Sequence, residues 1–70
     1  MGHFTGSDMN ELSIRAFRAY SQGNYEEALE LGRQVYEAYR TYYGPNHNLT
    51  LAAKANMELY AARSKSISIL

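Results

Sequence analysis

The chain has 70 residues, contains no cysteine, and balances seven basic against seven acidic side chains. A chain of this length forms at most one domain and buries only about 60% of its unfolded surface, so its core is small. Zero formal net charge excludes the basic surface that binding to nucleic acid or to an anionic membrane requires. The missing cysteines exclude disulfides, thiolate nucleophiles and cysteine-based zinc sites, and two histidines are too few for another metal centre. We therefore expect a small neutral module that carries no metal and no cofactor.

We expect no targeting segment at either end of the chain. Residues 1–8 lack the apolar stretch of a signal peptide, and no apolar run approaches the about 20 residues of a membrane span. The Gly-Ser pair at 6–7 is also typical of residues left by cloning, so whether this segment is native stays open. We expect a cytoplasmic protein with a flexible segment at 1–8, a helical domain at 9–65 and a tail at 66–70.

Residues 9–22 are predicted to form the first helix. Their apolar side chains recur at helical spacing, and charged side chains occupy the other face. Asp8 is a candidate N-cap, and Gly23 is expected to end the helix because glycine adopts the left-handed conformation that helix ends favour. The apolar positions are Leu12, Ala16, Phe17, Ala19 and Tyr20.

A second helix is predicted over residues 25–43 and a third over residues 49–65. Asn24 and Asn48 are candidate N-caps, and the Gly-Pro pair at 44–45 stops the second helix because proline cannot continue its hydrogen bonding. We expect the third helix to pack on the first two through one apolar face. That face consists of Leu51, Ala55, Leu59 and Ala62. The predicted fold class is therefore all-α, with an antiparallel first pair of helices.

The two predicted turns resemble those of the tetratricopeptide repeat, a hairpin of two helices. Residues 23–28 read Gly-Asn-Tyr-Glu-Glu-Ala and are similar to the Gly-x-Tyr-x-x-Ala step inside such a repeat. Residues 43–47 are similar to the Gly-Pro linker of the longer repeats found in kinesin light chains. The 21 residues from Gly23 to Gly44 suit a repeat of about 42 rather than 34 residues. The resemblance implies one repeat plus the first helix of a second, which caps the hairpin.

The same resemblance implies where a partner would bind. Members of the family bind extended peptides on the surface formed by the first helix of each repeat, and Asn56 matches an asparagine that bonds a peptide backbone. Ser13 and Phe17 stand where chaperone-binding members carry lysine and asparagine, so that ligand class is not expected. Gly32 stands where an aromatic residue is usual. The candidate partner-binding residues are Ser13, Phe17, Tyr20, Asn56, Leu59 and Arg63.

For the side chains that could carry chemistry, a structural role is the stronger interpretation. By the resemblance, His47 folds back on its turn and helps cap the third helix, rather than acting as a general base. The glutamates at 26, 27 and 30 are expected to form a solvated acidic face rather than a cation site. Seven tyrosines are more than a plain helical bundle uses. We expect a buried pair, Tyr25 and Tyr36, and an exposed group, Tyr39, Tyr42 and Tyr60.

Self-association is a further expectation. Residues 66–70 alternate serine and isoleucine, a period typical of a strand. The last three residues would also suit the peptide groove of a PDZ domain. The preferred interpretation is a frayed tail or a continuing helix. Because a core of this size is marginal, we expect a homodimer through apolar residues that lack cover. The candidate dimer residues are Met57, Tyr60, Ile67, Ile69 and Leu70.

The predicted function is a non-enzymatic protein–protein interaction module, an adaptor or regulatory docking unit for a peptide or protein. The alternative is a truncated structural or oligomerisation piece of a longer repeat array, with its function in the missing part. A small helical enzyme is the third possibility, and it is disfavoured because no cluster of titratable side chains converges in the sequence.

Overall fold

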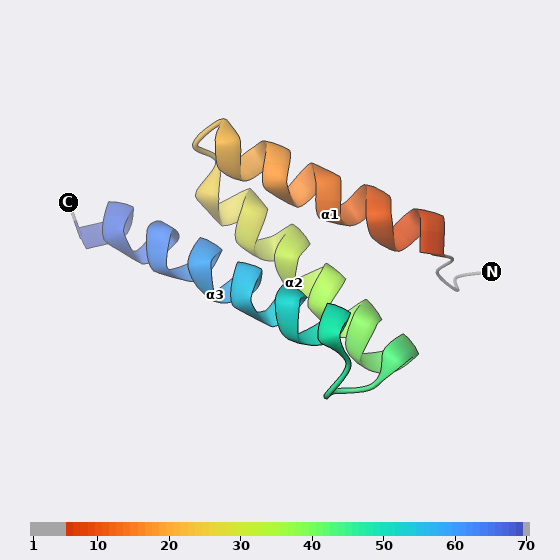
Figure 1. Cartoon of the computed structure of the whole chain (residues 1–70). Coiled ribbons are helices and arrows are strands. Elements are labelled where there is room, and N and C mark those ends of the chain that lie inside the picture. Colours follow the sequence, from red (N-terminus) through yellow and green to blue (C-terminus); the bar gives the residue numbers. More distant parts are fainter. Residues whose placement is uncertain (1–5, 70) are drawn as a thin grey trace.

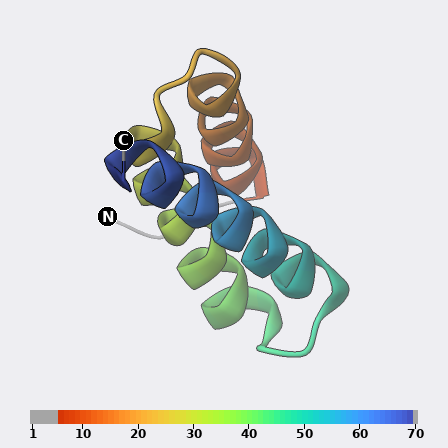
Figure 2. The ribbon, with the colours of Figure 1, turned by 90° about the vertical axis from the view of Figure 1, so that its left-hand side faces the viewer.

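The computed structural model describes residues 6–69 of the chain and the side chains of residues 9–65. It consists of three helices, α1 (Gly6–Ser21), α2 (Tyr25–Tyr43) and α3 (Asn48–Ile69). Consecutive helices run antiparallel, and α2 lies between α1 and α3 and contacts both (Figures 1 and 2). The all-α prediction is confirmed, and the predicted bounds of the second helix agree with α2.

The turn between α1 and α2 is closed by glycine, as predicted. Gly23 has a φ of 84°, and its amide donates to the carbonyl of Tyr20 at 3.1 Å. The Asn24 amide donates to the carbonyl of Ala19 at 2.9 Å. This pair of bonds satisfies carbonyls in the last turn of α1, where the Ala19 carbonyl also accepts the Gln22 amide at 3.2 Å. The turn requires the left-handed conformation that glycine adopts without strain.

The helix starts differ from the predicted caps. α1 begins at Gly6, so Asp8 lies inside the helix instead of capping it. Asn24 occupies the N-cap position of α2, but its side chain makes no capping hydrogen bond. α3 begins at Asn48, and its cap comes from His47, whose Nδ1 accepts the Leu49 amide at 3.1 Å. The predicted capping role of His47 is therefore confirmed, and that of Asn48 is wrong.

The end of α3 also differs from the predicted bound. The backbone continues as helix to Ile69, so the alternating segment at 66–69 does not form the strand that its period suggests. The side chains of Ile67 and Ile69, and the whole of Leu70, lie outside the described residues. A continuing helix, the preferred interpretation of this segment, is the one observed.

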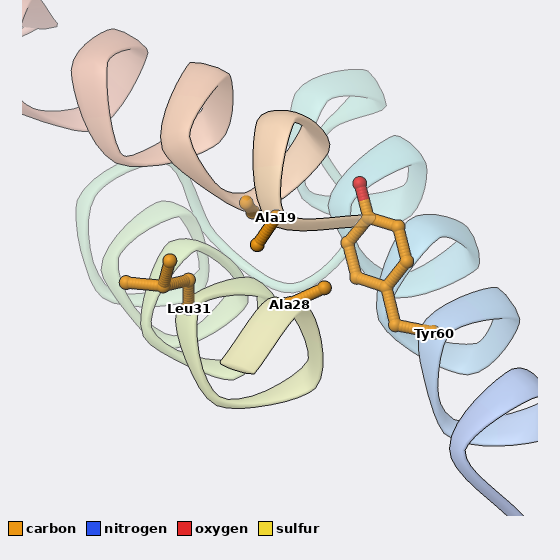
Figure 3. Close-up of a cluster of buried hydrophobic side chains, with 5 residues drawn as sticks. Ala19, Ala28, Leu31 and Tyr60 are labelled. Carbon is orange, nitrogen blue, oxygen red and sulfur yellow. The ribbon is translucent and has the colours of Figure 1, made fainter. Parts of the chain in front are cut away.

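A small cluster of buried side chains joins all three helices. Four of its five members are small or aliphatic, and the fifth is Tyr60, whose ring reaches from α3 toward Ala19 of α1 and Ala28 of α2 (Figure 3). Ala28 is fully buried, as close approach of two helices requires. The members are Ala16, Ala19, Ala28, Leu31 and Tyr60, and Leu12, Tyr20 and Leu29 pack against them.

α3 packs through a different face from the predicted one. The four apolar residues expected to face the first pair, Leu51, Ala55, Leu59 and Ala62, are all exposed. The buried or half-buried positions are Thr50, Ala53, Met57, Tyr60, Ala61 and Ser64, on the opposite side of the helix. The predicted exposure of Tyr60 is thus wrong, since it is 4% exposed. The apolar residues of α3 itself are spread over all sides of the helix, so their spacing alone does not identify the face that packs.

Candidate binding groove

A shallow groove of about 140 Å³ runs between α1 and α3 and has α2 as its floor. Ser13 and Ala16 form the α1 wall, and Ala52 and Asn56 belong to the α3 wall. Helix α2 contributes Gly32, Val35 and Tyr39 to the lining. The small side chains on both walls leave the space that defines the groove, because larger ones would close it.

The two ends of the groove are held by contacts between α2 and α3. At one end, Thr50 is fully buried, and its hydroxyl donates to the backbone carbonyl of Tyr39 at 3.1 Å. At the other end, the Tyr60 ring lies against the backbone of Gly32: a Cβ built on Gly32 would stand 2.9 Å from the Tyr60 Cδ2. The aromatic group that the repeat pattern places at position 32 is absent, and a tyrosine from α3 fills the space.

Tyr20 and Tyr60 join the two groove walls at this second end. Their ring centroids are 5.1 Å apart, and Tyr20 also contacts Tyr25 at 5.4 Å. These distances lie in the range of favourable aromatic pairs. Burial raises the pKa of the Tyr60 phenol, and the neighbouring Tyr20 adds to the rise. The aromatic contacts therefore fix the spacing between α1 and α3.

The structure brings together part of the predicted partner-binding set. Ser13 and Asn56 line the groove from opposite walls. Phe17 is 62% exposed and lies beside Tyr20, with ring centroids 6.5 Å apart. Leu59 and Arg63 are exposed but do not line the groove. Leu59 lies on the side of α3 that faces away from α2.

Several groove residues were not among the predicted set. Gly32, Val35 and Tyr39 lie on α2, which the resemblance does not assign to the binding surface. Leu49 and Ala53 line the groove from α3. Gly32, where the repeat pattern has an aromatic residue, was the sequence signal that could have located the α2 floor of the groove. A glycine at such a position indicates that another group approaches the backbone closely.

None of the ten residues that line the groove carries a charged side chain. Among the described residues, one ion pair forms, between Arg40 and Glu37 at 3.6 Å, and both of its side chains are exposed on α2. No group of three or more potential metal ligands occurs in the part of the chain that the structure describes. The groove can therefore contact a ligand through apolar surface and through the neutral polar groups of Ser13 and Asn56.

A second aromatic cluster lies at the far end of α2. Tyr39 and Tyr42 each contact Tyr43, with centroid distances of 5.5 and 5.2 Å, and His47 stacks on Tyr43 at 4.6 Å. The stacking holds the His47 ring beneath the start of α3, where its Nδ1 accepts the Leu49 amide. This cluster stabilises the turn between α2 and α3. Packing within the protein therefore accounts for these four rings, and no ligand is needed to explain them.

Comparison with known proteins agrees with this architecture. A family model described as tetratricopeptide repeat matches residues 12–49, which include most of α1, all of α2 and the following turn. No curated protein and no solved structure matches the chain. Within residues 6–69, no helix combines the length and apolar character needed to cross a membrane. Repeats of this family generally serve as protein–protein interaction modules. The chain belongs to the tetratricopeptide repeat family.

Proposed function

We propose that the protein is a non-enzymatic docking unit whose groove between α1 and α3 binds an extended segment of a partner protein. The observation that carries this proposal is the groove itself, an apolar channel with a neutral polar group on each wall. We also propose that the repeat is of the longer type found in kinesin light chains. The protein would act in the cytoplasm as an adaptor or regulatory unit.

The composition of the groove favours one kind of ligand. An extended peptide exposes backbone amides and carbonyls, and the Asn56 amide group can both donate to and accept from them. The Ser13 hydroxyl on the opposite wall has the same dual capacity. The exposed Leu49 and Ala52 and the half-buried Tyr39 offer apolar surface beside these polar groups. A neutral peptide with small apolar side chains matches these features, whereas a strongly charged peptide finds no opposite charge in the lining.

A peptide-display selection on the full chain tests the proposal. We expect enriched peptides whose affinity, measured by calorimetry, falls about three- to tenfold in Asn56→Ala, the loss of one hydrogen bond. Ala52→Arg should abolish binding, because Ala52 is exposed and lines the groove, so a long side chain there obstructs the groove without disturbing the core.

Gln34→Ala is the matched control, since it removes an exposed amide side chain from α2 outside the groove. Affinity should be unchanged in this variant, and circular dichroism should show equal helicity in all three. Peptides that bind Ala52→Arg as tightly as the original chain would place the binding site elsewhere, and a selection without enriched peptides would contradict a peptide groove.

A further inference from the structure

The outer side of α3 is an apolar stripe that no other helix of the described chain covers. Its members recur at i, i+4, i+8 and i+11, and they point away from α2 because the packed face of the helix lies opposite. Leu51 is 48% exposed and Leu59 is 44% exposed. The stripe, as we use the term, consists of Leu51, Ala55, Leu59 and Ala62. An exposed apolar stripe opposite the packed face of a helix marks a surface that another helix could cover.

The order of side chains along the stripe is self-complementary. It reads large, small, large, small: Leu51, Ala55, Leu59, Ala62. When two copies of α3 pack antiparallel about a two-fold axis near residues 56–57, Leu51 faces Ala62 of the other copy, and Leu59 faces its Ala55, each to within one residue. Large side chains then fill the spaces left by small ones. A parallel arrangement would set leucine on leucine and alanine on alanine, and would leave gaps.

The charges beside the stripe fit the same register. Lys54 and Glu58 lie on one flank of the stripe, and both are exposed. Neither forms an ion pair within the described residues. In an antiparallel pair of helices each flank meets its own counterpart, so Lys54 of one copy faces Glu58 of the other, and the reverse contact forms as well. Glu58 is the only acidic residue of α3, and this register places Lys54 of the other copy opposite it.

We propose that this stripe is a homodimer interface, in which α3 of one copy packs antiparallel on α3 of a second copy. The interface differs from the predicted one, because Tyr60 is buried within its own copy and Met57 is half-buried there. A single helix face is smaller than the about 800 Å² per partner of a standard interface. The dimer is therefore weak, with a dissociation constant between about 10 µM and 1 mM.

Charge reversal on the full chain tests both the interface and its register, with sedimentation equilibrium as the measurement. Lys54→Glu and Glu58→Lys alone each place like charges opposite each other twice, and each should weaken dimerisation about tenfold or more. The double variant with both reversals should recover the original affinity. An equimolar mixture of the two single variants should form heterodimers, because every flank contact between them is attractive.

Leu59→Glu should also abolish dimerisation, whereas Ile14→Glu should leave it unchanged. Ile14 is the matched control because it is 49% exposed on α1, comparable to Leu51 and Leu59 on α3. Circular dichroism checks that each variant keeps its helicity, and the charge variants serve if Leu59→Glu does not fold. A chain that stays monomeric up to about 1 mM would overturn the proposal. Dimers that resist Leu59→Glu, or single reversals that do not form heterodimers, would overturn it equally.

Discussion

The two helix interfaces of this molecule are built from side chains of different size. Between α1 and α2 the buried residues are mainly alanines, and the fully buried Ala28 lets the two helices approach closely. Between α2 and α3 the contact depends on the bulky Tyr60 ring, which lies on the backbone at Gly32. The first interface depends on small side chains at its closest approach, and the second depends on one large ring packed on a residue without a side chain. Removing the Tyr60 ring should therefore cost the most stability, and adding even a methyl group beside it at Gly32 should also destabilise the protein.

The largest effect is expected for Tyr60→Ala. Removing a buried aromatic side chain costs about 3–5 kcal/mol, and Tyr60 belongs to a cluster that joins all three helices. Total stability is about 0.05–0.15 kcal/mol per residue in small domains, so this chain should lose most of its folded population. Urea unfolding followed by circular dichroism measures the change. Tyr60→Phe keeps the ring and should lose much less, and a loss below about 1 kcal/mol in Tyr60→Ala would contradict the central role of the ring.

Gly32→Ala should destabilise the protein even though alanine is the better helix former. The substitution gains about 1 kcal/mol in helix propensity, but the new Cβ would meet the Tyr60 ring at 2.9 Å. Overpacking costs about 1–3 kcal/mol, so a net loss of up to about 2 kcal/mol is expected in the free energy of unfolding.

The background variant Tyr60→Leu provides the control for this prediction. With the ring gone, Gly32→Ala should stabilise the protein by up to about 1 kcal/mol, because only the helix propensity remains. The change of sign between the two backgrounds measures the coupling of Gly32 and Tyr60. Equal effects in both backgrounds would show that the ring and the glycine act independently.

The two interhelical turns should differ in their tolerance of side chains. Gly44 has φ 103° and ψ 159°, a region that is essentially restricted to glycine. A Cβ added at Gly23, where φ is 84°, would have no heavy atom within 4 Å, so only backbone strain opposes a substitution there. We expect Gly44→Ala to cost about 1–3 kcal/mol and Gly23→Ala about 1–2 kcal/mol. Thermal unfolding measures both changes.

Asparagine separates the two cases further. It enters the left-handed region more readily than other residues, so Gly23→Asn should recover part of the loss seen in Gly23→Ala. Gly44→Asn should recover little, because the backbone at Gly44 lies outside that region. If asparagine restores stability equally at both positions, the two turns do not differ in the way proposed.

Sequence reasoning located the helices and turns but not the packing face of α3. The turns were predictable because glycine and proline act locally, through backbone conformation at Gly23 and Gly44. The face of α3 was not, because apolar residues occur on all sides of it and the buried Thr50 counts as polar in any periodic pattern. Its burial depends on the carbonyl of Tyr39, a partner eleven residues earlier in the chain. The groove was predictable only in part. Ser13 and Asn56 follow from the repeat pattern, whereas the residues of its floor depend on how α3 is rotated against α2.

The smallest expected effect concerns alkaline pH and again separates the two interfaces. Burial raises the pKa of Tyr60 above that of the unfolded chain, so the folded protein holds this phenol proton more tightly. Below about pH 10 both states are protonated, and Tyr60 gives stability no pH dependence. As pH rises above about 10, unfolding releases the proton, and the free energy of unfolding should fall. Urea midpoints at a series of pH values measure this decline. Tyr60→Phe removes the ionisable group at the α2–α3 interface, so its decline should be shallower, and an identical slope in the two proteins would show that Tyr60 does not ionise on unfolding.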